Sequence, residues 1–439
     1  MRGLILASLL AAAGAAPTDV PPRVNAARLR QRIEALSVFG RPAGGSFADG
    51  VSRTAFSDAD VAARAYVMDE MRALGLEPRI DPAGNILGRR AGSEASLKPI
   101  LFGSHIDSVK GGGNFDGDYG SMAALEVIAT LEEMGLRPRH PLEVVIWAAE
   151  ESSYGSGING SRAAAGQLDP GELERVQDGI VKADALRRIG GDPARIGEAR
   201  RGEGSFLCYL ELHIEQGGKL DRAGIPIGVV EGIVTIDDHE VSVGGFANHA
   251  GTTPMPDRRD ALVAAAQVVL AVREIATAEA GPQVGTVGRL NVSPNAPNVV
   301  PGSVQMTVEF RDLSGEKVAR MGEALRVRAA EIAERTGTEV VARFTSRHEG
   351  ARADAALQSA IEATASRLGL RHMRLPSGAY HDAQMMARLG PMGMIFVPSL
   401  GGISHSPREL TRWEDCASGA DVLLGTILAL DRRSAQGAE

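Results

Sequence analysis

Residues 103 to 120, GSHIDSVKGGGNFDGDYG, combine His105, Asp107 and Asp116 with closely spaced glycines. Glycine is favoured where the backbone must turn with a positive φ or approach another group closely, so this stretch does not suit a regular helix or strand. A histidine and two aspartates on such a turn indicate a site that binds a cation. A surface loop with solvated carboxylates has the same composition, so the remaining motifs must decide between the two.

Further candidate ligands follow short apolar runs elsewhere in the chain. Glu150 and Glu151 are adjacent at the end of the run LEVVIWAA. His213 lies in ELHIEQGGKL, and His405 follows the run MIFVPS. Two neighbouring carboxylates at the end of a buried strand repel each other unless a cation neutralises one of them. We therefore expect one glutamate to bind metal and the other to move protons, although a solvated acidic loop would also fit the pair.

Together these side chains are sufficient to bind two divalent metal ions. Each ion would have one imidazole, one terminal ligand and a share of a common aspartate, drawn from the set His105, Asp116, Glu151, His213 and His405. Nitrogen and oxygen donors suit Zn²⁺ or Mn²⁺, and Co²⁺ is also possible. Asp107 lies two residues after His105, on the same side of an extended chain, where it can hydrogen-bond the outer nitrogen of the imidazole. The other histidines are interpreted as ordinary polar residues with satisfied hydrogen bonds: His140, His239, His348 and His372.

Strand-like and helix-like segments alternate around these motifs. KPILFGSH and PLEVVIWAAEE are short apolar runs typical of buried strands, and SMAALEVIATLEEMG between them predicts a helix that ends at Gly135. Strand, helix and strand in this order predict a crossover unit, so the first 220 residues are expected to be α/β. His105 would then lie at the carboxyl end of a strand, where open α/β sheets bind ligands.

The pattern changes between about residues 222 and 340. The predicted order there is β-α-β-β-α-β, which is the ferredoxin-like split unit and can form a small domain of its own. Helices and strands of the first kind resume after residue 350. We therefore expect an α/β fold in which a mixed sheet covered by helices spans 17–221 and 341–439, with a ferredoxin-like α+β domain inserted at 222–340.

The composition limits the classes of partner. A hydrophobic content of 44% and a charged content of 23% are those of a soluble globular protein. A net charge of −8 argues against nucleic acid and against stable association with anionic membranes, but it still allows an anionic small-molecule substrate. The only cysteines, Cys208 and Cys416, provide neither a disulfide framework nor a thiolate metal cluster, and the sequence leaves open whether they pair.

The N-terminus, MRGLILASLLAAAGAAPTDV, has one basic residue, an apolar run and then small residues. This pattern predicts a secretory signal peptide over residues 1–16, and hence a periplasmic mature protein. An alanine-rich disordered start or a retained membrane anchor would also fit the pattern, and without a working signal the protein would be cytoplasmic.

Several motifs along the chain resemble those of a known family. The stretches GSHIDSV, AEES, GSRAAAG, ELHIEQG, GFANHAGTTPMPDRRDAL, NAPNVVPG, EFRD, SGAYHDAQ and GISHSP are similar to the hydantoinase/carbamoylase family of amidases, from about residue 40 to 425. That family includes N-carbamoyl-L-amino acid hydrolases, β-ureidopropionases and allantoate amidohydrolases, within the dinuclear metallopeptidases that have a lid domain. The resemblance implies that Asp116 bridges the metals. It also implies that His105 and His213 complete one site and that Glu151 and His405 complete the other.

The resemblance also implies roles for other residues. Glu150 would be the general base, with Asp107 counted beside it among the catalytic residues. His249, from the inserted lid and dimerisation domain of a homodimer partner, would help to bind the substrate and its oxyanion. The remaining substrate-binding positions are Gln216, Asn298, Arg311 and Gly378. The residue chemistry agrees for Arg311, whose guanidinium can grip a carboxylate bidentately, and for His249, which can donate to developing negative charge.

The expected function is metal-dependent hydrolysis of the carbamoyl (ureido) C–N bond of N-carbamoyl-L-amino acids or similar ureido acids. Hydrolysis of allantoate, or of N-acyl-amino acids and peptides, is the alternative. A non-catalytic protein that binds small anions is a further alternative, which would have no need to keep Glu150 beside a full set of ligands. One departure affects substrate choice: relatives often carry an Arg-Phe pair after the glutamates, whereas SSYGSGINGSR has Tyr154 and no arginine before its last position.

Overall fold

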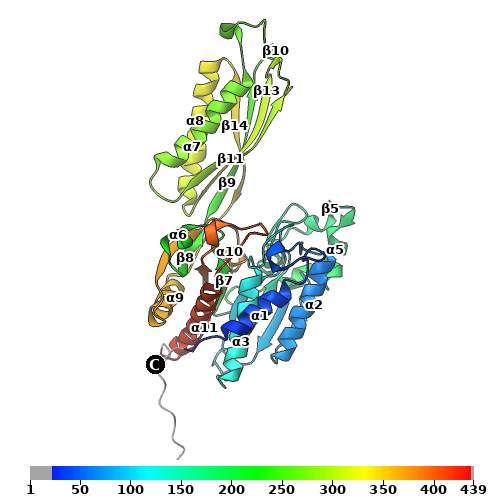
Figure 1. Ribbon diagram of the computed structural model, residues 1–439, viewed down its shortest axis with the longest axis vertical. Coiled ribbons are helices and arrows are strands. Elements are labelled where there is room, and N and C mark those ends of the chain that lie inside the picture. The colour runs from blue at the N-terminus through cyan, green and yellow to red at the C-terminus, as the bar shows by residue number, and fades with distance from the viewer. Residues whose placement is uncertain (1–21, 437–439) are drawn as a thin grey trace, which may run out of the picture.

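The structure is a computed structural model that describes residues 22–436, and the predicted signal peptide lies outside the described residues. Figure 1 shows two parts joined by a narrow waist. We call residues 235–348, which form a four-stranded sheet with its helices, the small part; the rest, built on a nine-stranded sheet, is the large part. The fold is a mixed α/β fold, as the sequence predicts.

The large sheet has the strand order β1-β2-β4-β3-β7-β17-β8-β15, and β16 pairs with β8 outside this path. Its strands are β1 (Glu77–Ile80), β2 (Ile86–Arg90), β3 (Ile100–His105), β4 (Leu142–Trp147), β7 (Cys208–Ile214), β8 (Ile227–Ile233), β15 (Ala351–Arg352), β16 (His372–Ser377) and β17 (Met392–Val397). The four central strands β4, β3, β7 and β17 run parallel to one another. The pairs β1–β2, β2–β4 and β17–β8 are antiparallel, so the sheet is mixed.

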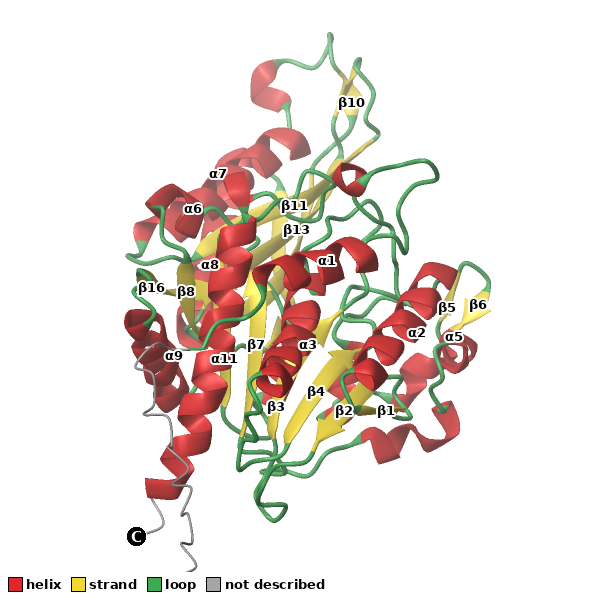
Figure 2. Ribbon diagram, turned by 60° about the horizontal axis from the view of Figure 1, so that its bottom comes forward, coloured by secondary structure: helices red, strands yellow, loops and turns green. Residues whose placement is uncertain are grey.

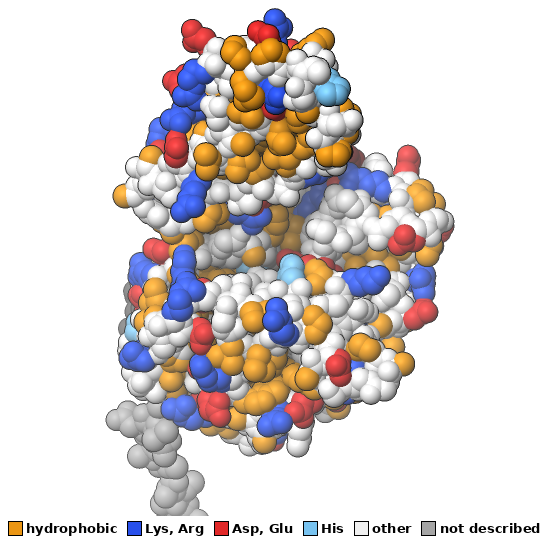
Figure 3. All heavy atoms as spheres, turned by 45° about the horizontal axis from the view of Figure 1, so that its top comes forward, with side chains coloured by type: hydrophobic (Ala, Val, Ile, Leu, Met, Phe, Trp, Pro, Cys, Tyr) orange, Lys and Arg blue, Asp and Glu red, His pale blue; other side chains and the backbone are white. Residues whose placement is uncertain are grey.

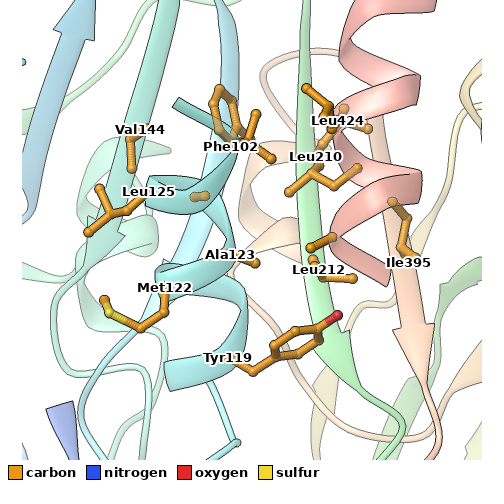
Figure 4. Close-up of a cluster of buried hydrophobic side chains, with 14 of the residues drawn as sticks. Phe102, Tyr119, Met122, Ala123, Leu125, Val144, Leu210, Leu212, Ile395 and Leu424 are labelled. Carbon is orange, nitrogen blue, oxygen red and sulfur yellow. The ribbon is translucent and has the colours of Figure 1, made fainter. Parts of the chain in front are cut away.

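Helices cover both faces of the large sheet. One face carries α1 (Ala26–Leu36), α2 (Asp58–Ala73), α3 (Asp118–Glu133), α9 (Ala355–Arg367) and α11 (Trp413–Gln436), several of which stand in front of the strands in Figure 2. Figure 4 shows this core, where Phe102 and Leu210 of the sheet meet Leu125 of α3 and Leu424 of α11. The parallel strands are buried along their whole length, because helices cover them on both sides.

The opposite face carries shorter elements. They are α4 (Asn159–Ala164), α5 (Lys182–Arg188), α6 (Lys219–Ala223), α10 (Ala383–Met386) and the hairpin of β5 (Val176–Gln177) and β6 (Ile180–Val181). Trp147 and Tyr209 lie in the core under this face, and the Trp147 indole donates to the Tyr209 hydroxyl at 2.9 Å. Cys208 and Cys416 are both buried and free, so the two cysteines do not pair.

The small part follows the predicted β-α-β-β-α-β order. Its elements are β9 (Thr235–Gly244), α7 (Ala261–Ala278), β11 (Val284–Ser293), β13 (Ser303–Asp312), α8 (Gly315–Thr336) and β14 (Glu339–His348), with a two-stranded tip of β10 (Asn248–His249) and β12 (Val299–Val300). The antiparallel sheet has the order β11-β13-β9-β14. α7 and α8 pack on one face around residues such as Val241, Phe310 and Leu325, and the other face is open.

The strand pairing differs from the predicted range of 222–340 at both ends. β8 begins at Ile227 but pairs with β16 and β17, so it belongs to the large sheet. β14 ends at His348 and pairs along β9, so it belongs to the small sheet. The run IPIGVVEGIV leads directly into β9, and its apolar pattern does not reveal which of the two sheets each strand joins.

Helix α7 combines a buried face with an exposed apolar one. Leu262, Val263 and Leu270 are exposed, with fractions of 37%, 52% and 61%. Within the described residues, α7 is the helix that has the length and apolar composition to cross a membrane, and 44% of it is buried inside the protein. The buried residues pack on the small sheet, so part of this apolar composition serves the core. The neighbouring strand β11 is an edge strand.

Candidate metal centre and active site

Two of the predicted ligands lie at the ends of neighbouring parallel strands. His105 is the last residue of β3, and His213 is the penultimate residue of β7. Both side chains are almost fully buried. Asp116 reaches them from the glycine-rich turn that leads into α3: its Oδ1 atom lies 3.7 Å from His105 Nε2 and 3.2 Å from His213 Nε2. We call His105, Asp116 and His213 the buried group.

The other predicted ligands lie on loops at the same edge of the sheet. Glu151 follows β4, and His405 follows β17. His405 Nε2 lies 3.2 Å from Asp116 Oδ2 and 3.4 Å from Glu151 Oε1. His405 is half exposed and has a φ of 53°, a left-handed conformation that is uncommon for a residue other than glycine. We call Asp116, Glu151 and His405 the rim group.

The donor atoms of each group lie within 4.8 Å of one another, so each group could hold a metal ion. The hydrogen bonds of the histidines also suit this use. The Nδ1 atom of His105 faces the Asp107 carbonyl oxygen at 3.0 Å, and that of His213 faces the Ile214 carbonyl oxygen at 2.9 Å. A carbonyl only accepts, so Nδ1 of each ring carries a proton, and Nε2 is the nitrogen that would bind a cation once the ring is neutral.

The carboxylate of Asp107 has a different partner from the one predicted. Its Oδ1 atom lies 3.8 Å from His105 Nδ1, and the main-chain carbonyl makes the closer contact. The carboxylate instead accepts hydrogen bonds from the backbone N–H groups of Glu150 and Glu151, at 3.1 and 3.0 Å. Spacing in the sequence placed Asp107 on the correct side of the chain, but the two N–H groups after β4 come from a distant segment. Asp107 therefore fixes the turn that presents both glutamates.

Burial and crowding control the charges of the acidic residues. Burial, then the charge of Glu151, raises the pKa of Glu150 well above its usual value. Burial, then Asp116, raises the pKa of Glu151 to about 7. Burial also acts to raise the pKa of Asp116, but hydrogen bonds from His213 and His405 outweigh it and hold that pKa well below its usual value. Without a cation, burial and like charge therefore favour the protonated form of both glutamates, and a bound cation would favour their charged form.

The histidines respond to the same environment. Burial lowers the pKa of His105 to about 4. For His213, burial is opposed by the hydrogen bond to Asp116, and the balance raises the pKa to about 9. The hydrogen bond to Asp116 likewise raises the pKa of His405 to about 9. Asp116 is therefore the electrostatic centre of both groups.

These groups open into a cavity of about 770 Å³ between the two parts of the molecule. Figure 3 shows the hollow, with a histidine at its lower edge and basic side chains beside it. Glu150 lines it, and its Oε2 atom lies 3.8 Å from His105 Nε2. Gln216 also lines it and donates from Nε2 to Asp116 Oδ2 at 2.7 Å.

Arg311 enters the cavity from β13 of the small part. Its Nε and Nη2 atoms donate to the two carboxylate oxygens of Glu309, at 2.9 and 3.0 Å, and Nη1 donates to the Gly378 carbonyl oxygen at 2.7 Å. A guanidinium has five N–H groups, so these bonds leave one N–H on each terminal nitrogen. The predicted substrate residues Arg311 and Gly378 thus meet where the small part contacts the large part.

Two predicted residues lie away from the cavity of their own chain. His249 is in β10 and is exposed, and the exposed Asn298 is beside it, where its carbonyl oxygen accepts from the Ala250 N–H at 2.9 Å. Figure 1 shows β10 at the end of the small part farthest from the large sheet. Within one chain, the structure does not bring these two residues to the metal-binding groups.

Sequence reasoning did not identify Glu409, which is buried and accepts from the backbone N–H groups of Phe115 and Asp116. The only signal was its place four residues after His405. His381, to which no role was assigned, is also buried, and its ring centre lies 4.5 Å from that of His213. Of the histidines interpreted as ordinary polar residues, His348 lines the cavity.

Comparisons with known proteins agree with this geometry. Residues 101–429 match the model of peptidase family M20/M25/M40. An N-carbamoyl-L-amino acid amidohydrolase of Geobacillus stearothermophilus is 40% identical over 93% of this chain and 99% of its own. A ureidoglycolate hydrolase of Oryza sativa subsp. japonica is 36% identical over 95% of this chain and 86% of its own.

Solved structures show the same relationship. A hydantoinase/carbamoylase family amidase from Burkholderia multivorans superposes with a TM-score of 0.86 at 36% identity, covering 93% of this chain and 98% of its own. The match extends over both parts of the molecule and confirms the family resemblance seen in the motifs. The chain therefore belongs to peptidase family M20/M25/M40, among relatives that are amidohydrolases and hydantoinase/carbamoylase family amidases.

Proposed function

We propose that the protein is a metal-dependent amidohydrolase that cleaves the carbamoyl C–N bond of N-carbamoyl-L-amino acids or similar ureido acids. The observation that carries this proposal is the position of Glu150 in the cavity beside two donor groups that share Asp116. Supporting it, the Geobacillus stearothermophilus relative of nearly equal extent bears the name of this activity.

In this proposal each donor group holds one divalent ion. His105, Asp116 and His213 hold the first, and Asp116, Glu151 and His405 hold the second. The nitrogen and oxygen donors suit Zn²⁺ or Mn²⁺, and Co²⁺ would also fit. Bound there, the ions would polarise the carbamoyl carbonyl and lower the pKa of a water molecule in the cavity.

The residues of the chain supply the remaining chemistry. Glu150 accepts the proton of the attacking water and returns it to the leaving nitrogen, from its position in the cavity beside His105. Asp107 orients Glu150 through the backbone. Arg311 uses its two remaining N–H groups to bind the substrate carboxylate. The Gly378 carbonyl oxygen holds the guanidinium in place, and Gln216 lines the same cavity. We propose that the small part acts as a lid that closes this space.

We further propose that the protein is a homodimer whose active sites are shared. The exposed apolar residues of α7 lie next to the edge strand β11, and a second copy could cover both. His249 and Asn298 of the partner subunit would then reach the cavity, where His249 donates to the negative charge that develops on the carbamoyl oxygen. Leu270→Asp should yield a monomer in light scattering, whereas Val327→Asp, at an exposed valine of α8 between Arg326 and Arg328, should not.

A second candidate is hydrolysis of allantoate or ureidoglycolate. It is favoured by the ureidoglycolate hydrolase of Oryza sativa subsp. japonica, which aligns with nearly all of this chain. N-acyl-amino acid or peptide hydrolysis is a third possibility, because the chain belongs to a peptidase family. All three reactions would use the same two donor groups and Glu150, and they differ in the substrate that the cavity binds.

One assay separates these candidates. Metal-free protein reloaded with Zn²⁺, Mn²⁺ or Co²⁺ is offered N-carbamoyl-L-amino acids, N-carbamoyl-β-alanine, allantoate, ureidoglycolate and dipeptides, and both ammonia and free amino acid are measured. We expect both products from N-carbamoyl-L-amino acids, and no activity from Glu150→Gln loaded with the same ion. Cleavage of dipeptides alone, with no ureido substrate used, would refute the proposal.

A further inference from the structure

One buried carboxylate joins two of the three loops that carry the residues of the rim group. Glu409, only 3% exposed, accepts at Oε1 from the backbone N–H groups of Phe115 and Asp116, at 3.0 and 3.1 Å. Its Oε2 atom accepts from the Ser404 hydroxyl at 2.8 Å. Ser404 immediately precedes His405, so a single side chain links the Asp116 turn to the His405 loop.

The glycine-rich turn leaves space for the Glu409 side chain at Gly113. A Cβ atom at Gly113 would overlap both Oε1 and Cβ of Glu409. Gly113 does not have a positive φ, so its backbone conformation alone would accept another residue. The requirement for glycine at this position is therefore the space that Glu409 occupies.

The two oxygens of Asp116 face different groups. Oδ1 lies near the histidines of the buried group, whereas Oδ2 lies 3.2 Å from His405 Nε2. Ser404 Oγ is also 3.2 Å from Oδ2, farther than its 2.8 Å contact with Glu409. A hydroxyl has one proton to donate. The Ser404 hydroxyl donates to Glu409 and therefore does not compete with a cation for Asp116 Oδ2, which also accepts from Gln216 Nε2 at 2.7 Å.

The two groups differ in how firmly their elements hold them. His105 and His213 are on buried strands of one sheet, so the packing of the core fixes their positions. His405 is half exposed on a loop with a positive φ, and no strand fixes it. The rim group therefore depends on local hydrogen bonds to bring its ligands together, and those of Glu409 span the gap.

We propose that Glu409 is a positioning residue for the rim group: it holds Asp116 and the His405 loop in register. It sets the cation affinity of that group more than that of the buried group, whose two histidines are fixed by buried strands. The proposal rests on the proposed metal centre and is independent of the substrate. Partners that orient metal ligands in this way typically change metal affinity about 10- to 100-fold when they are replaced.

The test counts and titrates cations in two variants. In Glu409→Gln the amide oxygen can still accept from the two backbone N–H groups, but the amide NH₂ now faces Ser404 and donates to it. The Ser404 hydroxyl must then donate to Asp116 Oδ2 instead. In Gly113→Ala the new Cβ displaces the intact carboxylate. Wild-type protein stripped of metal should take up two Zn²⁺ ions in calorimetry, and each variant should bind one of them about 10- to 100-fold more weakly.

Two controls make the result specific. Glu414→Gln, which alters an exposed glutamate five positions further along the chain, should bind both ions like the wild type. In a His405→Ala background, which already lacks a rim ligand, adding Glu409→Gln should cause no further loss. The melting temperature of each metal-free variant shows whether the fold itself has changed.

Two results would overturn the proposal. One is wild-type affinity for both ions in both variants; the other is equal weakening of both ions together with a lower melting temperature of the metal-free protein, which would assign Glu409 to the fold alone. Wild-type protein that takes up no Zn²⁺ would instead refute the metal centre itself, so the two failures are distinguished by the wild-type measurement.

Discussion

The large and the small part place their candidate residues in opposite ways. In the large part, candidate ligands that are far apart in the sequence meet at one edge of a single sheet. His105 and His213 lie at the ends of β3 and β7, and His405 is on the loop after β17. In the small part, His249 and Asn298 lie at the exposed tip, away from the cavity of their own chain. The large part alone therefore carries every residue of both donor groups, whereas we propose that substrate binding also requires the small part and a second copy.

The largest expected effect is in the large part. Asp116→Ala removes the ligand that both groups share, so we expect loss of both ions and of all measurable activity. Elemental analysis after dialysis, together with ammonia release, measures this, and Lys110→Ala on the same turn is the exposed control. Full activity of Asp116→Ala without metal would contradict the convergence of the two groups on this residue.

The neighbouring glutamates should separate by role. Glu150→Gln should keep both ions and the KM while kcat falls about 10²- to 10⁴-fold, because an amide cannot accept the proton. Glu151→Gln should instead weaken one ion. Metal counts and steady-state kinetics on both variants provide the comparison, and equal metal loss in the two would show that the roles have been assigned incorrectly.

Arg311 tests the contact between the two parts. Arg311→Lys keeps the charge but loses the planar fork, so kcat/KM for substrates with a free carboxylate should fall about 10- to 100-fold, in line with a lost charged hydrogen bond. The exposed Arg343→Lys on the same sheet is the control. If the wild type cleaves amidated substrates as well as free acids, Arg311 has another role.

The smallest expected change is a partial return of activity on mixing two variants, and it tests the tip. Glu150→Ala and His249→Ala should each be nearly inactive as pure dimers. After free exchange, half of the dimers are mixed and half of their sites are intact, so about one quarter of wild-type activity should return. Activity that stays at the average of the two variants would show that His249 acts within its own chain or not at all.

Much of this arrangement could be predicted because it follows from strand ends and spacing. The apolar runs before His105, Glu150 and His405 identified buried strands, and the carboxyl ends of parallel strands lie at one edge. The β-α-β-β-α-β order of the small part was equally evident from helical and alternating patterns. Glycines in GGGNFDGD indicated a turn, although not what lies against it.

The remainder depends on tertiary contacts that local patterns do not contain. Asp107 could be placed beside His105, but its carboxylate binds backbone groups that another strand brings to it. Glu409 follows a proline and an arginine in a polar loop, which is the pattern of a solvated acid, and only the folded turn at Gly113 buries it. The ends of the small part were misplaced because β8 is as apolar as its neighbour β9 but pairs with the other sheet.

The pairing of β8 with β15 makes the small part a separable module. Ile233 and Ala351 are opposite each other on adjacent antiparallel strands, so the chain leaves the large sheet and returns to it at neighbouring points. A hairpin link of about two to four residues could join these strands directly. The shortened chain would retain every residue of the buried and rim groups and would lose Arg311, Asn298 and His249. One excision would therefore separate the residues that we propose bind metal from three that we propose bind the substrate.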